Sequence, residues 1–323
     1  ILRVYHNMNK STREEILKKL EKKQISKEKL LELGIDCFSE KTLERIFNCG
    51  NFIQAVMNVD RTSSKVVKAN RCMNRFCPIC MATKSRKDAY MLNIILEYLK
   101  SSFDYEFLFL TLTVPNVAGD ELVRELNKQY EAIQRLTKRK EFKAVSKGYV
   151  RKTEITYNQE RNDFHPHIHM LIAVDKSYFT NCKLYVKHSR WLDLWKSCRQ
   201  NDNISQVNIK KADTNSFKEL SKYEAKDFEM LSYSQEVFEY FHNALHGRKT
   251  LTYNGCFHIG KKKFQNGELD SFKETDPVEY VDTSFHSYEL DISRYKLVKE
   301  RELSKNEHLK FNNMKIMDER IIE

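Results

Sequence analysis

Apolar residues recur along this chain with two spacings, one typical of helices and the other of strands. Helical spacing predicts helices over residues 11–33, 84–100, 119–146, 183–200 and 216–247. Runs rich in β-branched and aromatic residues predict strands over residues 106–114, 148–158, 165–174 and 205–212. The polar turn NQERND joins the second and third of these strands, so we expect an antiparallel hairpin. From about residue 298 the chain is highly charged, and we expect helix or loosely held chain there.

The third of these strands, HPHIHMLIAV, carries two histidines in phase. Successive side chains of a strand point to opposite sides, and the even-numbered residues from 168 to 174 are all apolar. His167 and His169 therefore lie side by side on the other face, which is typical of metal ligands. Glu154 on the partner strand reaches the same face if the hairpin is in register, and His165 is the alternative third ligand. Two histidines and a carboxylate leave room for a substrate oxygen on a divalent ion, which suits phosphate chemistry.

A second group of metal ligands is indicated by the cysteines. Cys72, Cys77 and Cys80 follow the spacing C-x4-C-x2-C within NRCMNRFCPIC. Thiolates at this spacing can surround one tetrahedral zinc ion, and C-P-I-C is typical of a zinc half-site. A fourth ligand is required, for which Cys49 is the nearest candidate and Cys37 the reserve. We therefore predict a small cysteine region that binds a structural Zn²⁺ ion.

The composition favours a nucleic acid as partner. A net charge of +11 with 31% charged residues suits a polyanion, with nucleic acid before a membrane surface. Lys84, Arg86 and Lys87 directly follow the cysteines, and we expect them to contact DNA phosphates. Eight cysteines are too few for a disulfide scaffold in 323 residues. We find neither a signal peptide nor an apolar run near the ~18 residues of a membrane span, so we expect a cytoplasmic protein.

The segment NSFKELSKYEAKDFEML places a tyrosine and a glutamate on one helical stripe. Glu219 and Tyr223 are four residues apart. Lys222 and Lys226 flank the tyrosine, and we expect them to contact DNA and offset phosphate charge. A phenol with its ordinary pKa near 10 is a weak nucleophile, and a nearby cation makes its attack feasible. The structural alternative is a helix start, because Ser216 and Glu219 fit the capping box S-x-x-E.

The order of three segments resembles a known family. FLTLTVPNV, then HPHIHMLIAV, then ELSKYEAKD resemble the successive motifs of the rolling-circle replication initiators (Rep) of small plasmids, which are endonucleases of the HUH class. The resemblance also covers NRFCPIC, GYVRKTEITYN and DPVEYV, and so extends over roughly residues 40–285. It implies an α+β fold with a central antiparallel sheet and flanking helices, plus the small zinc-binding cysteine region. We expect four parts: a charged helical segment over 1–36, the zinc knuckle and basic helix over 37–100, the HUH nuclease domain over 101–250, and a C-terminal extension over 251–323 for DNA binding or partly flexible chain.

The resemblance also implies a reaction. Tyr223 would attack one strand at the plasmid origin, become covalently linked to the DNA 5′ end and leave a 3′-OH primer. Glu219 would activate water for the second cleavage that ends the cycle. Mn²⁺ or Mg²⁺ would be held by His167, His169 and Glu154. The implied partners are origin DNA, with a hairpin and a single-stranded nick site, and the helicase and DNA polymerase of a bacterial host. A dimer would add a second copy of the chain as partner.

Two other functions fit part of this pattern. A relaxase or transposase of the same HUH class would share the chemistry and differ in its DNA partner. A zinc-stapled DNA-binding module without catalysis would explain the charge and the cysteines. It would not require the histidine pair, the tyrosine or the glutamate.

Overall fold

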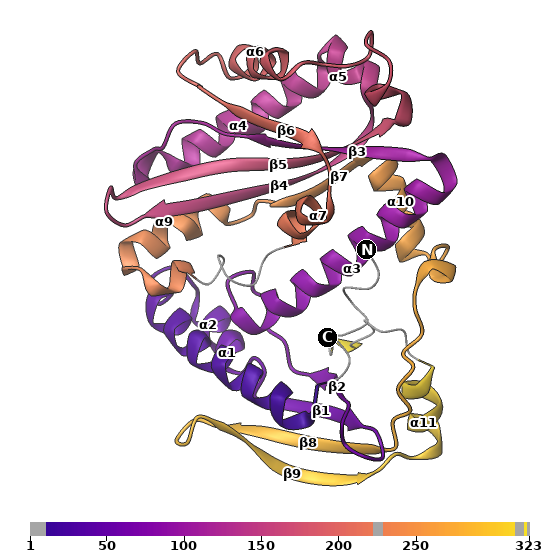
Figure 1. The fold of residues 1–323 in the computed structure, drawn as a ribbon. Coiled ribbons are helices and arrows are strands. Elements are labelled where there is room, and N and C mark those ends of the chain that lie inside the picture. The colour runs from indigo at the N-terminus through magenta and orange to yellow at the C-terminus, as the bar shows by residue number, and fades with distance from the viewer. Residues whose placement is uncertain (1–10, 222–228, 314–319, 322–323) are drawn as a thin grey trace. The chain divides into compact units, whose positions relative to one another are not determined.

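The computed structural model describes residues 11–221, 229–313 and 320–321 (Figure 1). The chain divides into two compact units, each built around a five-stranded sheet. The first unit comprises residues 1–93, 223–238 and 271–323, and the second comprises residues 94–222 and 239–270. Both sheets are antiparallel apart from one short parallel pair, and helices flank them, which confirms the predicted α+β class. Within the described residues, no helix combines the length and apolar character needed to cross a membrane.

The sheet of the second unit has the strand order β6-β3-β5-β4-β7. Its strands are β3 (Tyr105–Leu112), β4 (Ser146–Asn158), β5 (Asp163–Asp175), β6 (Val207–Lys211) and β7 (Leu251–Gly255). Strands β4 and β5 are 13 residues long and pair along their whole length, so the predicted hairpin is present. Strand β5 is the middle strand and pairs with β3 and β4 along its two edges, and the phase of its side chains decides what each face contains.

Helices cover the two faces of this sheet (Figure 1). On one face lie α4 (Leu122–Lys138), α5 (Lys140–Val145) and α6 (His188–Arg199). The even-numbered residues from 168 to 174 are fully buried in the core on this side, as their pattern predicts. On the other face lie α7 (Thr214–Ser221) and α10 (Cys256–Gln265), and Phe107 of β3 contacts Phe217 and Phe257 of these two helices. The histidine face of β5 therefore points toward the side of α7.

Two predicted helices are interrupted. Residues 119–146 form α4 and α5, because Arg139 between them has an extended backbone. Residues 216–247 do not form one helix either, because Tyr233 is extended and α9 (Gln235–Leu245) begins after it. The hydroxyl of Ser234 accepts a hydrogen bond from the backbone of Val237, which caps this new helix. A serine side chain that bonds to nearby backbone favours the start of a new helix over continuation of the preceding one, and the spacing of apolar residues alone does not show this.

The sheet of the first unit combines strands from the early part of the chain with strands from its late part. Its strand order is β10-β2-β1-β8-β9, with β1 (Phe52–Met57), β2 (Ser64–Ala69), β8 (Asp282–Glu289), β9 (Arg294–Glu302) and β10 (Arg320–Ile321). Helix α1 (Arg13–Leu33) packs on one face, and α11 (Lys305–Asn312) packs on part of the other. Helix α2 (Glu40–Phe47) precedes β1, and the 26-residue helix α3 (Pro78–Phe103) leads from this unit into the second one.

Candidate active site and cysteine cluster

The two histidines and the glutamate come together on one face of the β4–β5 hairpin. Glu154 lies opposite His167 in the hairpin register, and each of the three residues is at most 9% exposed. Nε2 of His167 is 3.8 Å from one carboxylate oxygen of Glu154, and Nε2 of His169 is 3.5 Å from the other. Two atoms that each lie about 2.1 Å from one ion are at most about 4.2 Å apart. Both distances are below this limit, and the three side chains together could hold one divalent ion.

Hydrogen bonds at the other ring nitrogens orient both imidazoles. Nδ1 of His167 is 3.1 Å from the backbone oxygen of His165, and Nδ1 of His169 is 3.0 Å from Thr111 Oγ1. When Nδ1 donates its proton there, the lone pair of Nε2 is available to a metal. Among the described residues, Nε2 of His169 is buried without a hydrogen-bond partner, and an ion would supply the contact that this atom lacks. Burial lowers the pKa of His167 to about 4, so its ring is neutral near pH 7, as a ligand must be.

His165 takes a different place in this arrangement. Its ring stacks on that of His167 with centroids 5.2 Å apart, and its backbone oxygen accepts the hydrogen bond just described. The atoms that converge within ligand distance come from Glu154, His167 and His169. The geometry therefore favours Glu154 over His165 as the third ligand.

Pattern reading missed two residues of this face. Lys152 lies opposite His169 in the hairpin and is only 2% exposed, so a buried cationic side chain adjoins the candidate ligands. A signal for it was present, since Lys152 is two residues before Glu154 and alternate residues of a strand share a face. Thr111 pairs with His169 from β3 on the other side. That contact depends on the register of strands far apart in sequence, which no local pattern supplies.

The predicted nucleophile lies beyond what the structure describes. Tyr223, Lys222 and Lys226 are outside the described residues. Glu219 lies in the last turn of α7, but its side chain is also outside the description. What the structure does place is the helix that leads into this segment.

Helix α7 begins with a cap other than the predicted one. The carboxylate of Asp213 accepts hydrogen bonds of 2.7 Å from both the backbone nitrogen and the hydroxyl of Ser216. The backbone nitrogen of Asp213 donates in return to the Ser216 hydroxyl. These bonds from Ser216 lower the pKa of Asp213 to about 2, so the cap remains charged at neutral pH. The capping box expected at Ser216 and Glu219 is therefore formed by Asp213 and Ser216 instead.

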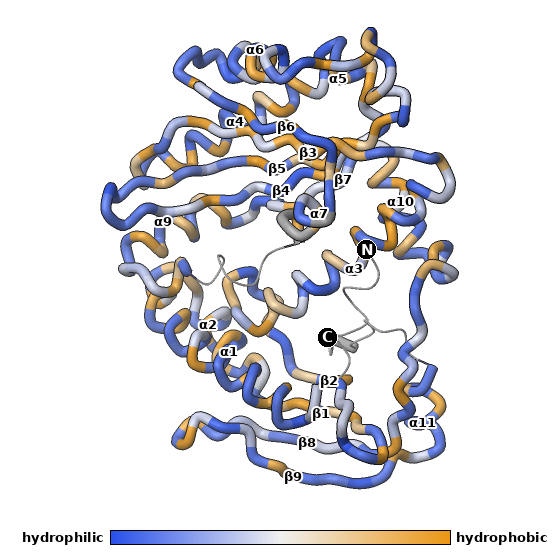
Figure 2. Tube along the Cα trace, viewed as in Figure 1, coloured by the Kyte–Doolittle hydropathy of each residue, from blue (hydrophilic) through white to orange (hydrophobic). Residues whose placement is uncertain are grey.

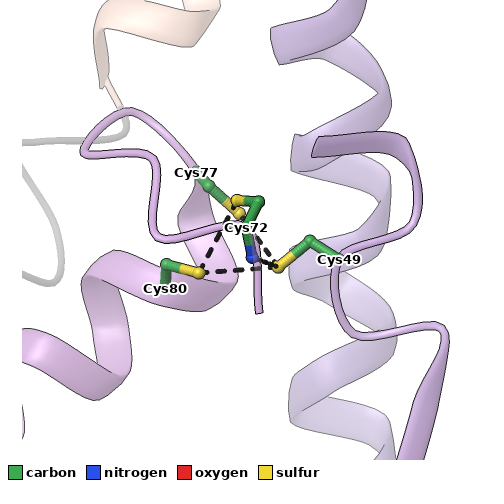
Figure 3. Close-up of side chains that lie close together, drawn as sticks. All are labelled: Cys49, Cys72, Cys77 and Cys80. Carbon is green, nitrogen blue, oxygen red and sulfur yellow. Dashed lines mark hydrogen bonds between the residues drawn. The ribbon is translucent and has the colours of Figure 1, made fainter. Parts of the chain in front are cut away.

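Four cysteines lie close together in the first unit, namely Cys49, Cys72, Cys77 and Cys80 (Figure 3). Pro78 is the first residue of α3, a position where its missing N–H costs little, so the helix starts directly after Cys77 and places Cys80 in its first turn. Cys49 comes from the turn after α2, next to Gly50, whose φ of +75° favours glycine. The turn and the helix start thus bring Cys49 to the knuckle, as predicted, and the reserve candidate Cys37 is not in the group.

The distances between the sulfurs fit a tetrahedral metal. Cys80 Sγ is 3.5 Å from Cys49 Sγ and 3.7 Å from Cys72 Sγ, and Cys49 and Cys77 are 3.6 Å apart. Four sulfurs about 2.3 Å from one zinc ion would be about 3.8 Å from one another. The pKa of Cys80 is lowered because the neighbouring thiols donate hydrogen bonds to its sulfur, which favours the thiolate that a metal requires. This buried group could therefore hold zinc.

A buried lysine lies beside the cysteine cluster. Lys27 of α1 is 1% exposed, and its ammonium group donates to the backbone oxygens of Phe47 and Cys49 and to Asn51 Oδ1, at 2.6, 3.1 and 3.0 Å. None of these three acceptors carries a charge. Burial lowers the pKa of Lys27, and the sulfurs of Cys49 and Cys77 offset part of that effect. Sequence reading missed Lys27, because it is one of many lysines in a charged helix.

Of the five basic residues predicted to contact DNA, Lys84, Arg86 and Lys87 lie on α3, and Lys222 and Lys226 lie outside the described residues. Lys84 is exposed and forms an ion pair with Asp88 one turn later. Arg86 and Lys87 are half-buried, and Arg86 Nε donates to the backbone oxygen of Ala82. Of the three, Lys84 is therefore the most accessible to a phosphate.

Known proteins with similar sequences are replication proteins. The family described as "Replication protein" matches residues 63–300. A protein named "Protein rep" from Staphylococcus aureus is 44% identical over 195 residues, which cover 59% of this chain and 85% of that protein. Another "Protein rep", from Streptococcus pneumoniae, is 32% identical over 251 residues, which cover 74% of this chain and 77% of that protein. No solved structure matches the chain. Because the family match covers most of the sequence and confirms the resemblance to Rep initiators, the chain belongs to the replication protein family.

Proposed function

We propose that the protein starts rolling-circle replication of a plasmid by nicking one DNA strand at the origin. The observation that carries this proposal is the buried group of Glu154, His167 and His169, in which both Nε2 atoms face one carboxylate. Burying polar side chains is costly unless they are paired or bind a metal. A protein that only bound DNA would have no use for such a group, so the group supports an enzyme.

The residues of this chain would divide the work of nicking. A divalent ion such as Mn²⁺ or Mg²⁺, when bound by the group, would act as a Lewis acid toward the phosphate to be cut. Tyr223 Oη would attack the phosphorus while the bond to the 3′ oxygen breaks, which links the tyrosine to the 5′ end. The phenol loses one proton and the departing 3′ oxygen gains one, so the step balances. Lys152, Lys222 and Lys226 would offset the charge of the phosphate.

The end of the cycle would need a different group. Glu219 would direct a water molecule to the regenerated phosphate, so that the second cleavage ends in hydrolysis and not in another covalent link. Between the two cleavages the free 3′-OH would prime a host DNA polymerase, and a host helicase would open the duplex. The four cysteines would hold a structural Zn²⁺ ion that fixes the start of α3.

A nicking assay tests the proposal. Supercoiled plasmid that carries the DNA adjacent to the coding sequence should be converted to the open-circular form with Mn²⁺ or Mg²⁺, and not with EDTA. Binding of that DNA without any nicking, under all metal conditions, would instead identify a non-catalytic DNA-binding module.

Replacing Thr111 should lower the affinity for the metal, although Thr111 is not one of the candidate ligands. Thr111→Val keeps the size of the side chain but removes the oxygen that accepts from His169 Nδ1, so the ring loses its fixed orientation. Loss of such a supporting hydrogen bond typically costs about 10- to 100-fold in metal affinity or activity. Calorimetric titration with Mn²⁺ should show this loss. Thr111→Ser is the control and should bind Mn²⁺ nearly as wild type; equal affinity of Thr111→Val would show that the hydrogen bond has no such role.

Lys27 should help the cysteine cluster to retain zinc, because its positive charge compensates the negative charge of the zinc site. Four thiolates around Zn²⁺ carry two net negative charges, and Lys27 is the buried cation beside them. The purified protein should contain about one zinc ion per chain, and Lys27→Met should release it to a chelating dye about 10- to 100-fold faster. Lys29→Met, on the exposed side of the same helix, should release it at the wild-type rate.

Zinc-free protein gives the opposite expectation for Lys27. Without the negative site, a buried ammonium is a cost, so Lys27→Met should then raise the stability toward urea. If Lys27→Met releases zinc at the wild-type rate, charge compensation is not its role.

A further inference from the structure

One face of the sheet in the first unit is covered over only part of its area. At one end of the face Val56 and Thr283 are completely buried, where Phe311 of α11 packs on the sheet. Farther along the same face Phe52 is 36% exposed and Phe285 is partly exposed. The uncovered part therefore presents aromatic side chains to the surroundings, among the residues that the structure describes.

The strand register shows that these aromatic side chains share a face. Phe285 of β8 lies opposite Gln54 of β1, and Gln54 and Phe52 are two residues apart, so all three point to the same side. The two phenyl rings are 6.2 Å apart and tilted by 32°. The guanidinium of Arg301 lies over the Phe285 ring, 5.7 Å from its centroid, and adds a cation to the pair.

Positive side chains flank the two rings on both sides. Lys68 of β2 lies opposite Gln54, and Lys299 of β9 lies opposite Phe285; both are exposed. Acidic residues on this side include Asp276, Glu289 and Glu307, which form ion pairs with Lys65, Lys296 and Arg301. The charge that remains next to the rings is positive, which complements a phosphate backbone.

We propose that this surface, made of Phe52, Phe285, Lys68 and Lys299, binds unpaired DNA bases by stacking. A sheet face with partly exposed aromatic rings between lysines offers stacking to any base and charge to its phosphate. Base faces are accessible only where the strands are separated, because neighbouring bases cover them in a duplex. The inference rests on the proposed function in one respect, that nicking at an origin supplies single-stranded DNA.

The test measures DNA binding without catalysis. The probe is a fluorescein-labelled oligothymidylate of about 20 nucleotides in the presence of EDTA, bound to the full chain and followed by anisotropy. Replacing both phenylalanines (F52A with F285A) should weaken binding about 5- to 150-fold, the cost expected for one lost stacked base. Tyrosine at both positions should restore binding, since it keeps an aromatic ring. Binding of a duplex of the same length should change much less.

Two further variants separate stacking from folding. Leucine at both positions keeps apolar bulk against the sheet but has no ring face, so it should bind as weakly as the alanine variant. Leu297→Ala removes an exposed apolar residue from the opposite face of β9 and should bind as wild type. Unchanged binding by the leucine variant overturns the proposal.

A cross-linking experiment locates the bound strand. Oligonucleotides with 5-iododeoxyuridine should cross-link on irradiation to peptides that contain Phe52 or Phe285. Cross-links found only in residues 94–222 would overturn the proposal. Neither assay requires cleavage, so a protein that nicks DNA but fails these tests would lose the stacking surface and keep its proposed function. A protein that passes these tests but never nicks DNA would keep the stacking surface and lose its proposed function.

Discussion

Alanine at His167 or His169 is expected to reduce origin nicking by about 10³-fold or more. Each imidazole supplies one of three converging ligand atoms, and a bound ion typically contributes several kcal/mol to stabilising charge in the transition state. Binding of double-stranded origin DNA should remain, because it depends on the basic surface and not on these buried rings. Initial rates of plasmid nicking at saturating Mn²⁺, together with a gel-shift assay, measure the two effects separately.

The control for these variants is an exposed histidine of the same unit. His258→Ala on α10 should nick at the wild-type rate. Glu154→Ala should be as defective as the two histidine variants, whereas His165→Ala should retain more activity, because its backbone oxygen still accepts from His167. If instead His165→Ala is inactive and Glu154→Ala is active, His165 and not Glu154 is the third ligand.

Tyr223→Phe is expected to eliminate the covalent DNA adduct and with it nearly all initiation. The phenyl ring remains but the attacking oxygen is gone, and no other group of the proposed site forms the link. Glu219→Ala should still nick and still form the adduct, yet fail to terminate and release multimeric plasmid products. Loss of a general base typically costs about 10²- to 10⁴-fold in the step that it serves, so the two defects should be clearly distinct.

A denaturing gel of protein with labelled oligonucleotide measures the adduct, and plasmid length after replication measures termination. Tyr240→Phe, a tyrosine of α9 whose ring packs on Phe164, serves as the matched control and should form the adduct normally. Persistence of the adduct in Tyr223→Phe, or its mapping to Tyr233, would show that another tyrosine is the nucleophile.

Sequence patterns predicted best where one local period controls the structure. The phase of β5 was visible because one face is uninterrupted core, and that phase alone placed His167 beside His169. The position of Glu154 followed from a hairpin with a short turn, which nearly determines the register. The cysteine knuckle was equally local, since Pro78 and the helix start fix the spacing of Cys77 and Cys80.

Patterns failed where distant segments determine the structure. No strand was expected over β1 or β2, although both are present. Strand β1 pairs with β8 across more than 200 positions, and β2 enters the sheet by pairing with β1. The charged chain from about residue 298 was expected to be helix or loosely held chain, and α11 is indeed a helix, but the chain up to Glu302 belongs to the edge strand β9, which is largely hydrophilic (Figure 2). An edge strand with one deeply buried residue, Tyr295, lacks the apolar alternation that reveals a strand, and charge on an edge is also a protection against aggregation.

The sheet of the first unit has a consequence for the order of events during synthesis. Strand β1 cannot pair with β8 until the ribosome has added residue 289, by which time every segment of the second unit has been made. Non-local pairing of this kind is slow, and an unpaired β1 edge is prone to aggregate meanwhile. The four cysteines, by contrast, all lie between residues 49 and 80. Metal loading of a nascent chain would therefore hold the β1–β2 hairpin in place from early on, so zinc supply during translation should determine the yield of folded protein more than zinc added afterwards.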